Sequence, residues 1–408
     1  MRKPTIRFEG YTDDWEQRKL GDLVERVTRK NQDLVSELPL TISAQYGLID
    51  QNEFFDKRVA SKDVSGYYLI ENGEFAYNKS TSTDAPWGAI KRLDRYENGV
   101  LSTLYIVFGI KDNNSVDSDF LVSYYSTNLW HKGIHEIAAE GARNHGLLNI
   151  APIDFFETKL MIPPYIEEQT KIGKYFEKLE RLITLHQRKC EETKKLKKFM
   201  LQKIFPQKGE KVPEIRFSGF TADWEQRKVG ELLEERNEQA PMSADYPLMA
   251  FIANHGVAPK GERYDRSALV NDETGKKYKR TEFGDFIYSS NNLETGSIGL
   301  NKYGNACISP VYSIFKSTGK AELDFLGRRF LKKDFINEMV KWRQGVVYGQ
   351  WKIHETDFMK IQVTIPNMEE QKEIGQYFDY LDHLITLHQH KCEELQNIKK
   401  FMLQNMFI

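Results

Sequence analysis

The chain has 408 residues, of which 40% are hydrophobic and 12% aromatic, enough for more than one globular core. Its 58 Lys and Arg residues nearly balance 59 Asp and Glu residues, and this net charge of -1 argues against broad, non-specific attraction to a polyanion. No apolar run approaches the ~20 residues of a membrane span, the start lacks the core of a signal peptide, and the three cysteines are scattered. We therefore expect a soluble cytoplasmic protein with reduced thiols.

Two passages of the chain occur twice. Residues 6–23, IRFEGYTDDWEQRKLGDL, return at 215–232 as IRFSGFTADWEQRKVGEL, identical at 13 of 18 positions. Residues 167–205 return at 369–407, identical at 25 of 39 positions. One architecture is therefore used twice, as suits a molecule that reads two different things at a fixed separation.

The regions between the repeated passages, 24–161 and 233–364, share only scattered residues. Each alternates short strand and turn patterns with some helix, which predicts an α/β or α+β fold without a sustained βαβ rhythm. The GEFAY segment at 73–77 matches GDFIY at 284–288. We interpret such turn glycines and aromatics as parts of a common fold that carry structure rather than function.

Loops beside these matched segments are rich in Ser, Thr, Asn, Lys and Arg, the side chains that hydrogen-bond base edges and phosphates. The same residue types occur in any surface loop, so ordinary loop chemistry is the alternative. The candidate DNA contacts in the first region are Lys79, Ser80, Thr81, Ser82, Thr83, Trp87, Lys91, Arg92, Arg143, Asn144 and His145. Those in the second region are Ser289, Ser290, Asn291, Asn292, Lys302, Tyr303, Tyr348 and Gln350.

The second repeated passage predicts a long helix, because apolar or small residues recur in alternating steps of four and three. No proline interrupts either copy, so each could run as one helix roughly 58 Å long. The second variable region follows the end of one helix and leads into the start of the other, so we expect the helices to lie antiparallel about a pseudo-twofold axis. The predicted helix–helix seam comprises Ile172, Phe176, Leu179, Ile183, His186, Ile374, Phe378, Leu381, Ile385 and His388.

The sequence contains fragments of metal-binding and catalytic motifs, but none of them is complete. A His-x-x-x-Cys pair begins at His186 and again at His388, but both pairs lie on the seam, where His can fix register and Cys behaves as a small hydrophobe. We therefore predict no metal site. Pro-Pro-Tyr at 163–165 resembles part of an amino-methyltransferase motif, yet Ile162 cannot accept the required hydrogen bond. With no phosphate-binding loop or supported nucleophile, we predict no catalytic machinery.

Two variable regions, with repeated helices that begin P-x-x-EEQ and contain LITLHQ and KKFMLQ, closely resemble the specificity (S) subunit of type I restriction-modification systems. The resemblance covers essentially the whole chain. It implies a mixed α/β (α+β) fold with two globular target-recognition domains separated by a long two-helix antiparallel coiled coil. The expected boundaries are 1–161 for target-recognition domain 1, 162–207 for spacer helix 1, 208–364 for target-recognition domain 2 and 365–408 for spacer helix 2.

The resemblance also implies a function. Each target-recognition domain would read one half of a bipartite, asymmetric site in double-stranded DNA. The helices would set the half-site spacing and dock two modification (methyltransferase) subunits, and restriction (translocase and nuclease) subunits would join through the complex. The chain itself would be non-catalytic and bind no cofactor, with the methyl donor, ATP and magnesium on the partner subunits. The alternative is a non-catalytic protein–protein scaffold with paired binding domains.

Overall fold

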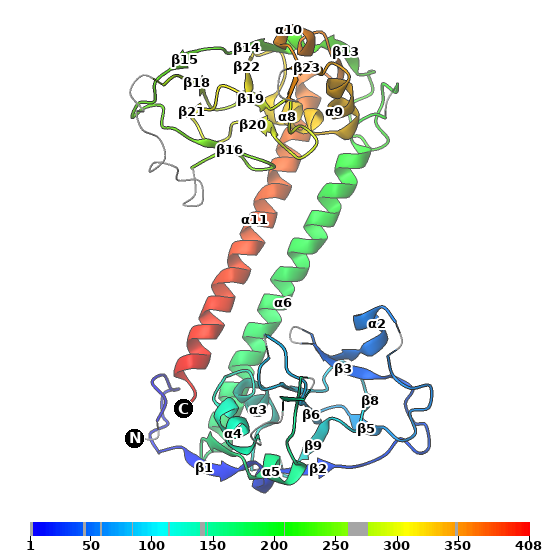
Figure 1. Cartoon of the computed structure of the whole chain (residues 1–408), viewed down its shortest axis with the longest axis vertical. Coiled ribbons are helices and arrows are strands. Elements are labelled where there is room, and N and C mark those ends of the chain that lie inside the picture. The colour runs from blue at the N-terminus through cyan, green and yellow to red at the C-terminus, as the bar shows by residue number, and fades with distance from the viewer. Residues whose placement is uncertain are drawn as a thin grey trace. The chain divides into compact units, whose positions relative to one another are not determined.

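The computed structural model divides the chain into two compact units. It describes residues 3–43, 46–57, 59–83, 85–112, 115–138, 143–144, 146–207, 209–259, 276–346 and 350–408. Unit 1 comprises Met1–Arg188 together with Gln389–Ile408, and unit 2 comprises Lys189–His388 (Figure 1). Each unit therefore holds one variable region and a part of each long helix. Among the described helices, none has both the length and the apolar character of a membrane span.

Unit 1 is built around a four-stranded antiparallel sheet with the order β2-β9-β6-β7. Its elements in chain order are β1 (Glu16–Lys19), α1 (Leu20–Leu23), β2 (Val24–Val27), β3 (Leu40–Ser43), β4 (Gly47–Asp50), α2 (Gln51–Phe55), β5 (Tyr68–Glu71), β6 (Phe75–Asn78), β7 (Ala89–Arg92), β8 (Asn98–Leu101), β9 (Ile106–Ile110), α3 (Ser118–Tyr124), α4 (Trp130–Ile137), β10 (Arg143–Asn144), β11 (Leu147–Leu148), α5 (Pro152–Glu157), β12 (Lys159–Ile162) and the first part of α6 (Ile166–Lys203). Phe75 and Phe108 stack at 5.3 Å between ring centroids on the core face of this sheet.

Unit 2 repeats this plan, with a central sheet of order β14-β22-β19-β20. Its elements are the last part of α6, then β13 (Glu225–Lys228), α7 (Val229–Leu232), β14 (Leu233–Glu235), β15 (Gln239–Ala240), β16 (Ala250–Ile252), β17 (Gly256–Ala258), β18 (Tyr278–Thr281), β19 (Phe286–Tyr288), β20 (Ile298–Leu300), β21 (Ala306–Ile308), β22 (Ser313–Ser317), α8 (Leu323–Phe330), α9 (Lys333–Val340), β23 (Gln344–Val346), β24 (Gln350–Lys352), α10 (Glu355–Phe358), β25 (Gln362–Ile365) and the first part of α11 (Met368–Asn405). Gly73 and Gly284 each precede the equivalent strand with a positive φ of 88° and 86°, a backbone conformation that favours glycine. The mixed helix and sheet fold, used twice, agrees with the predicted fold class.

The two repeated passages contact each other within each unit. The Arg7 guanidinium donates to both oxygens of Glu168 at 2.7 and 2.8 Å, and Arg216 donates to both oxygens of Glu370 at 2.7 Å. The two glutamate side chains are 0% and 1% exposed. A bidentate, charge-assisted pair therefore ties the N-terminal passage of each repeat to the first turn of its long helix.

The glutamine that follows each of these glutamates completes this attachment. Gln169 donates from Nε2 to the Pro163 carbonyl at 2.9 Å and accepts from the Asp117 amide at 2.9 Å. In unit 2 the Gln371 side chain bridges the Pro366 carbonyl and the Glu322 amide in the same way, at 2.8 and 3.0 Å. The EEQ sequence thus fastens each helix start to the chain before it and to the helix that packs beside it. We call this set of contacts the helix attachment.

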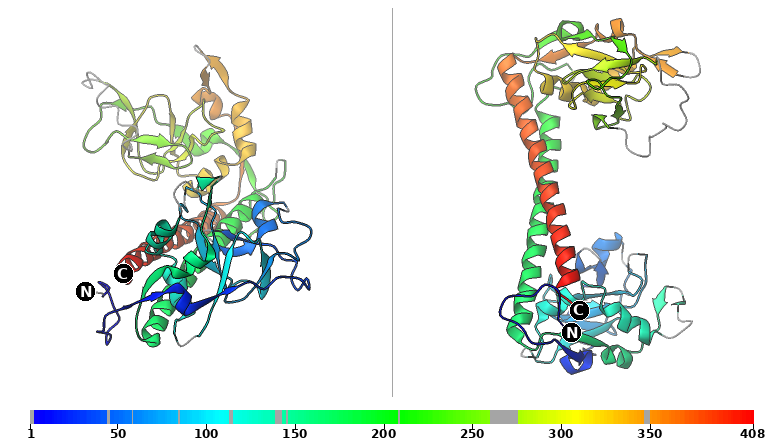
Figure 2. Two further views of the ribbon diagram at one scale, coloured as in Figure 1. Left: turned by 60° about the horizontal axis from the view of Figure 1, so that its bottom comes forward. Right: turned by 90° about the vertical axis from the view of Figure 1, so that its left-hand side faces the viewer.

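The long helices pair antiparallel inside each unit, as Figures 1 and 2 show. In unit 1 Lys399 donates to Glu180 at 2.6 Å, so the N-terminal part of α6 lies beside the C-terminal part of α11. In unit 2 Lys197 pairs with Asp382, which places the opposite parts of the two helices together. Both lysines occupy one repeat position and both acids another, so each ion pair is the counterpart of the other. The same pairing of the two helices therefore recurs in each unit.

The predicted seam residues also face the cores of the units. Ile172, Phe176, Leu179, Ile183, Ile374, Phe378 and Leu381 are buried, whereas Ile385, His186 and His388 are half-buried. The ring centroids of Phe176 and Phe407, which lies just after the end of α11, are 5.7 Å apart, and both residues belong to the core of unit 1. The start of α6 can pack closely against α3 because Gly173 has no side chain. A Cβ at this position would lie 2.7 Å from the Phe120 amide nitrogen of α3, too close for any other residue. The heptad pattern therefore reflects the burial of these side chains both in the globular core of each unit and against the other long helix.

Candidate nucleic-acid interface

The structure brings together two candidate loops of unit 1 that lie about 65 residues apart in sequence. The amide of Leu148 donates to the Lys79 carbonyl at 3.0 Å, and the amide of Thr81 donates to the Gly146 carbonyl at 2.7 Å. An isolated bridge also joins Ser80 to the β10–β11 hairpin. The loop after β6 and this hairpin therefore form one backbone surface, which we call reading loop 1 (residues 79–83, 143–144 and 146–148).

The side chains of reading loop 1 differ in how free they are to meet a ligand. Ser82 and Thr83 are exposed, whereas the Thr81 hydroxyl donates to the Gly146 carbonyl at 3.0 Å. Burial and the nearby charge of Arg26 lower the pKa of Lys79. Lys79 is half-buried, and its ammonium donates to the Ile150 carbonyl at 3.5 Å.

Trp87 lies at the far end of the same loop and packs into unit 1. Its ring meets His135 of α4 edge-on at 5.1 Å between centroids, and its carbonyl accepts from the Tyr77 hydroxyl at 2.9 Å. The ring is half-buried. Trp87 therefore anchors the end of this loop to α4 through His135 and to β6 through Tyr77.

Lys91 and Arg92 are not brought together with reading loop 1. Strand β7 runs antiparallel to β6, so these two residues lie at the opposite end of the hairpin from the loop. Arg92 is held by Asp94 at 2.6 Å and by Asp119 at 2.7 Å. Burial and the nearby Lys399 lower the pKa of Lys91, which faces the helix pair. Strand direction separates them from the loop residues, and sequence proximity alone could not reveal this.

Unit 2 has an equivalent pair of segments, the loop after β19 and the β23–β24 hairpin. Ser290 Oγ accepts from the Ile353 amide at 3.0 Å, and Asn291 Oδ1 accepts from the Trp351 amide at 2.6 Å. We call this surface reading loop 2 (residues 289–294 with 344–346 and 350–353). Ser290 is buried, so its side chain holds the hairpin in place and is not available to a ligand.

Three other candidates in reading loop 2 differ in their exposure to solvent. Ser289 is buried, and its amide donates to the Ser297 carbonyl at 2.8 Å. Asn292 and Gln350, in contrast, are exposed. Trp351, which the sequence did not single out, is 48% exposed on the same hairpin. Trp351 directly follows the candidate Gln350, and this position in the sequence was the signal that could have identified it.

Lys302 and Tyr303 lie beyond β20, at the end of the β19–β20 hairpin away from reading loop 2. Lys302 pairs with Asp324 at 2.6 Å and with Asp379 of α11 at 3.3 Å. Burial opposes its charge, but these carboxylates outweigh burial and raise its pKa. Tyr303 is 47% exposed. Lys302 therefore belongs to the contacts between α8 and α11 rather than to the loop surface.

The remaining candidates are described incompletely or not at all. His145 and Tyr348 lie outside the described residues, and for Arg143 and Asn144 only the backbone of β10 is described. Within the part of the chain that the structure describes, no group of three or more His, Cys, Asp or Glu side chains is placed to hold a metal ion. The surface available to a ligand is thus formed by loops, without a metal centre among these residues.

Comparison with known proteins assigns this architecture to a family. The model of the type I restriction modification DNA specificity domain matches the chain twice, over residues 12–195 and 221–397. These matches cover most of the chain, which therefore belongs to that family, as the sequence resemblance predicts.

Individual relatives agree with the family. Two Methanocaldococcus jannaschii proteins named as type I restriction enzyme specificity subunits are each 23% identical to the chain, over 407 and 413 residues. Each match covers 95% of this chain and 91% of the relative. The crystal structure of a type I restriction-modification S subunit from M. genitalium matches with a TM-score of 0.59 at 14% identity, over 100% of this chain and 99% of that one. At this identity the structural match establishes a shared fold.

Proposed function

We propose that the chain is the DNA sequence-recognition subunit of a type I restriction-modification complex in the cytoplasm, with each unit reading one half of a bipartite asymmetric site in double-stranded DNA. The observation that carries this proposal is that one fold occurs twice while its loops differ. Reading loop 1 exposes Ser82 and Thr83, whereas reading loop 2 exposes Asn292, Gln350 and Trp351. Different side chains on equivalent backbone surfaces would select different base sequences.

An exposed apolar stripe on each long helix supports docking of partner subunits. Leu196 and Phe199 of α6 are 45% and 48% exposed, and their repeat counterparts on α11, Ile398 and Phe401, are 37% and 55% exposed. Two equivalent stripes fit two copies of one partner, and we assign them to two modification subunits.

The other parts of the complex follow from this arrangement. The modification subunits would bring the methyl donor, and restriction subunits, joining through the complex, would bring ATP and magnesium. The paired helices would hold the two reading loops apart and so set the gap between half-sites. The near-neutral charge of the chain is consistent with partner subunits that supply much of the phosphate contact.

The test is to co-express the chain with its modification subunit and to map adenine methylation across a genome. A recognition subunit predicts one asymmetric bipartite motif. A protein–protein scaffold predicts no motif that depends on this chain, and that result would refute the proposal. The stripes are tested by Phe199→Glu and Phe401→Glu, each of which should remove one modification subunit from the complex in native mass spectrometry.

A further inference from the structure

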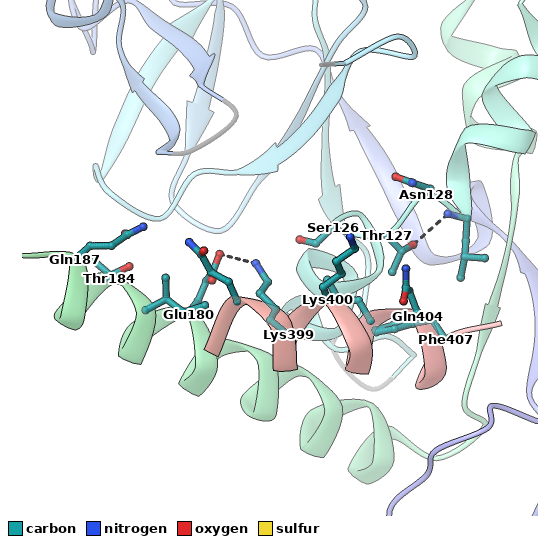
Figure 3. A pocket seen from close by; sticks show the side chains of 14 residues that line it. Ser126, Thr127, Asn128, Glu180, Thr184, Gln187, Lys399, Lys400, Gln404 and Phe407 are labelled. Carbon is teal, nitrogen blue, oxygen red and sulfur yellow. Dashed lines mark hydrogen bonds and ion pairs between the residues drawn. The ribbon is translucent and has the colours of Figure 1, made fainter. Parts of the chain in front are cut away.

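Two cavities occupy equivalent places in the two units, each between the helix pair and the loop that joins two short helices. The unit 1 cavity has a volume of about 640 Å³ and is bordered by residues 126–129, between α3 and α4 (Figure 3). The unit 2 cavity has a volume of about 940 Å³ and is bordered by residues 331–334, which comprise the link after α8 and the start of α9. Their helix positions also correspond: Leu403 and Gln404 line one cavity, and Leu201 and Gln202 line the other.

The two cavities differ sharply in charge. The charged residues that line the unit 1 cavity are Glu180, Lys399 and Lys400. Those that line the unit 2 cavity are Lys194, Lys197, Lys198, Lys332, Lys333, Asp334 and Asp382. Lys194, Lys332 and Lys333 stand where unit 1 has Gln396, Thr127 and Asn128. The unit 2 cavity therefore carries a net charge of +3 against +1 in unit 1, although the surrounding fold is the same.

Three of the five lysines have structural partners. Lys197 pairs with Asp382 across the helix pair, as Lys399 pairs with Glu180 in unit 1. Lys332 donates to the Leu201 carbonyl at 2.9 Å, where it satisfies an orphan acceptor in the last turn of α6. Lys194 pairs with Glu191 on the helix surface at 2.8 Å.

Lys198 and Lys333 have no such partner. Both side chains are exposed, and no hydrogen bond or ion pair joins either of them to another described residue. Asp334, the nearest acid in sequence, is already held by Arg329 at 2.8 Å. The ammonium groups of Lys198 and Lys333 therefore line the same open cavity without a partner among the described residues, whereas Lys194, Lys197 and Asp334 are each held in an ion pair.

Helix α9 connects this cavity to reading loop 2. Its first residue, Lys333, lines the cavity, and Arg343, three residues after its end, pairs with Glu294 of reading loop 2 at 2.8 Å. Eight helical residues span roughly 12 Å, which equals three to four base-pair steps of about 3.4 Å along the axis of B-DNA. A DNA backbone that leaves reading loop 2 along α9 would therefore reach the cavity within a few nucleotides.

We infer that the unit 2 cavity binds a phosphodiester of the DNA backbone through Lys198 and Lys333, a few nucleotides beyond the half-site read by unit 2. This rests on the proposed function. The contact is electrostatic and independent of base sequence, and it is asymmetric, because the equivalent cavity of unit 1 has only one of the two lysines, at Lys400. It strengthens DNA binding on one side of the site.

The first test measures the salt dependence of DNA binding by the chain in complex with its modification subunits, on a duplex that carries the mapped site. Each neutralised phosphate contributes about 0.9 to the slope of log affinity against log salt. Lys198→Gln with Lys333→Gln should lower the slope by about 1, as expected for one phosphate, and weaken specific and non-specific binding alike. Lys400→Gln, at the matched position of unit 1, should leave the slope unchanged, and Asn128→Lys should raise it. Equal effects at Lys198 and Lys400 would overturn the inference.

The second test locates the phosphate and distinguishes DNA from an acidic segment of a partner. Single neutral methylphosphonate linkages are placed along the two to five nucleotides beyond the unit 2 half-site. One of them should weaken binding by the unaltered complex but not by the Lys198→Gln, Lys333→Gln variant. Loss of a partner subunit from the variant, with an unchanged salt slope, would overturn the inference in favour of a protein ligand. Sequence-specific binding with no effect of either substitution would overturn the inference alone, whereas a complex without sequence preference would overturn the proposed function.

Discussion

Removing one partner of a buried ion pair should cost unit 1 much of its stability. Glu168 is 0% exposed and its two oxygens accept from Arg7, whose own side chain is 10% exposed. Arg7→Met leaves that carboxylate buried without its cation, a change that typically costs about 3–5 kcal/mol. For a unit of this size, each kcal/mol lowers the melting temperature by about 2–4 °C, so we expect a decrease of roughly 6–20 °C.

The assay is thermal unfolding followed by hydrogen exchange of peptides from each unit, which separates local from distant effects. Arg7→Met should raise exchange around residues 6–23 and at the start of α6. Arg216→Met provides the matched control, since it should do the same to unit 2 and spare unit 1. Replacing both partners, Arg7→Met with Glu168→Leu, should recover most of the loss because no unpaired charge remains. A double variant as unstable as the single one would refute this explanation.

Four further outcomes are expected. Exchanging residues 24–161 for those of a relative should change one half-site only in methylation mapping, and a change of both would contradict independent readout. Inserting four residues near Thr193 adds about 6 Å and about one helical turn, so the gap between half-sites should grow by one or two base pairs, and an unchanged gap in an active variant would contradict a spacing role. A fragment of residues 1–207, co-expressed with the modification subunit, should pair with a second copy and methylate an interrupted palindrome; a monomeric fragment would show that the two halves are not interchangeable. Phe407→Ala should destabilise unit 1 by about 3–5 kcal/mol in urea unfolding, and a loss below about 1 kcal/mol would contradict its place in the core.

The repeats made the architecture predictable. A 39-residue passage with heptad spacing and no proline predicts one long helix. The order of the segments along the chain then predicts that the two helices pair antiparallel. The role of EEQ was not predicted, because Glu168 meets a guanidinium 161 positions away and no local pattern encodes that contact. Long-range contacts of this kind form only once the unit has assembled.

Individual loop residues were harder to interpret. Ser290 and Asn291 are typical polar loop residues, yet their side chains accept backbone hydrogen bonds from β24 and the residue after it. Lys91 and Lys302 resemble phosphate contacts in sequence, but strand direction places both beside the long helices. Residue type alone does not distinguish a side chain that binds a ligand from one that holds a loop, because both use the same hydrogen-bonding groups.

The division of the chain into units has a consequence for synthesis on the ribosome. Unit 2 is a continuous stretch, Lys189–His388, so all of its residues are present before residue 389 is added. Unit 1 is interrupted, and its core includes Met406 and Phe407, which pack with Trp15 and Phe120. Residues 1–188 of unit 1 are made before unit 2, but their apolar surface around Trp15 is not covered by Met406 and Phe407 until those residues emerge. Unit 1 therefore starts to be made before unit 2 and finishes folding after it, and during that interval its uncovered core is exposed to aggregation and proteolysis.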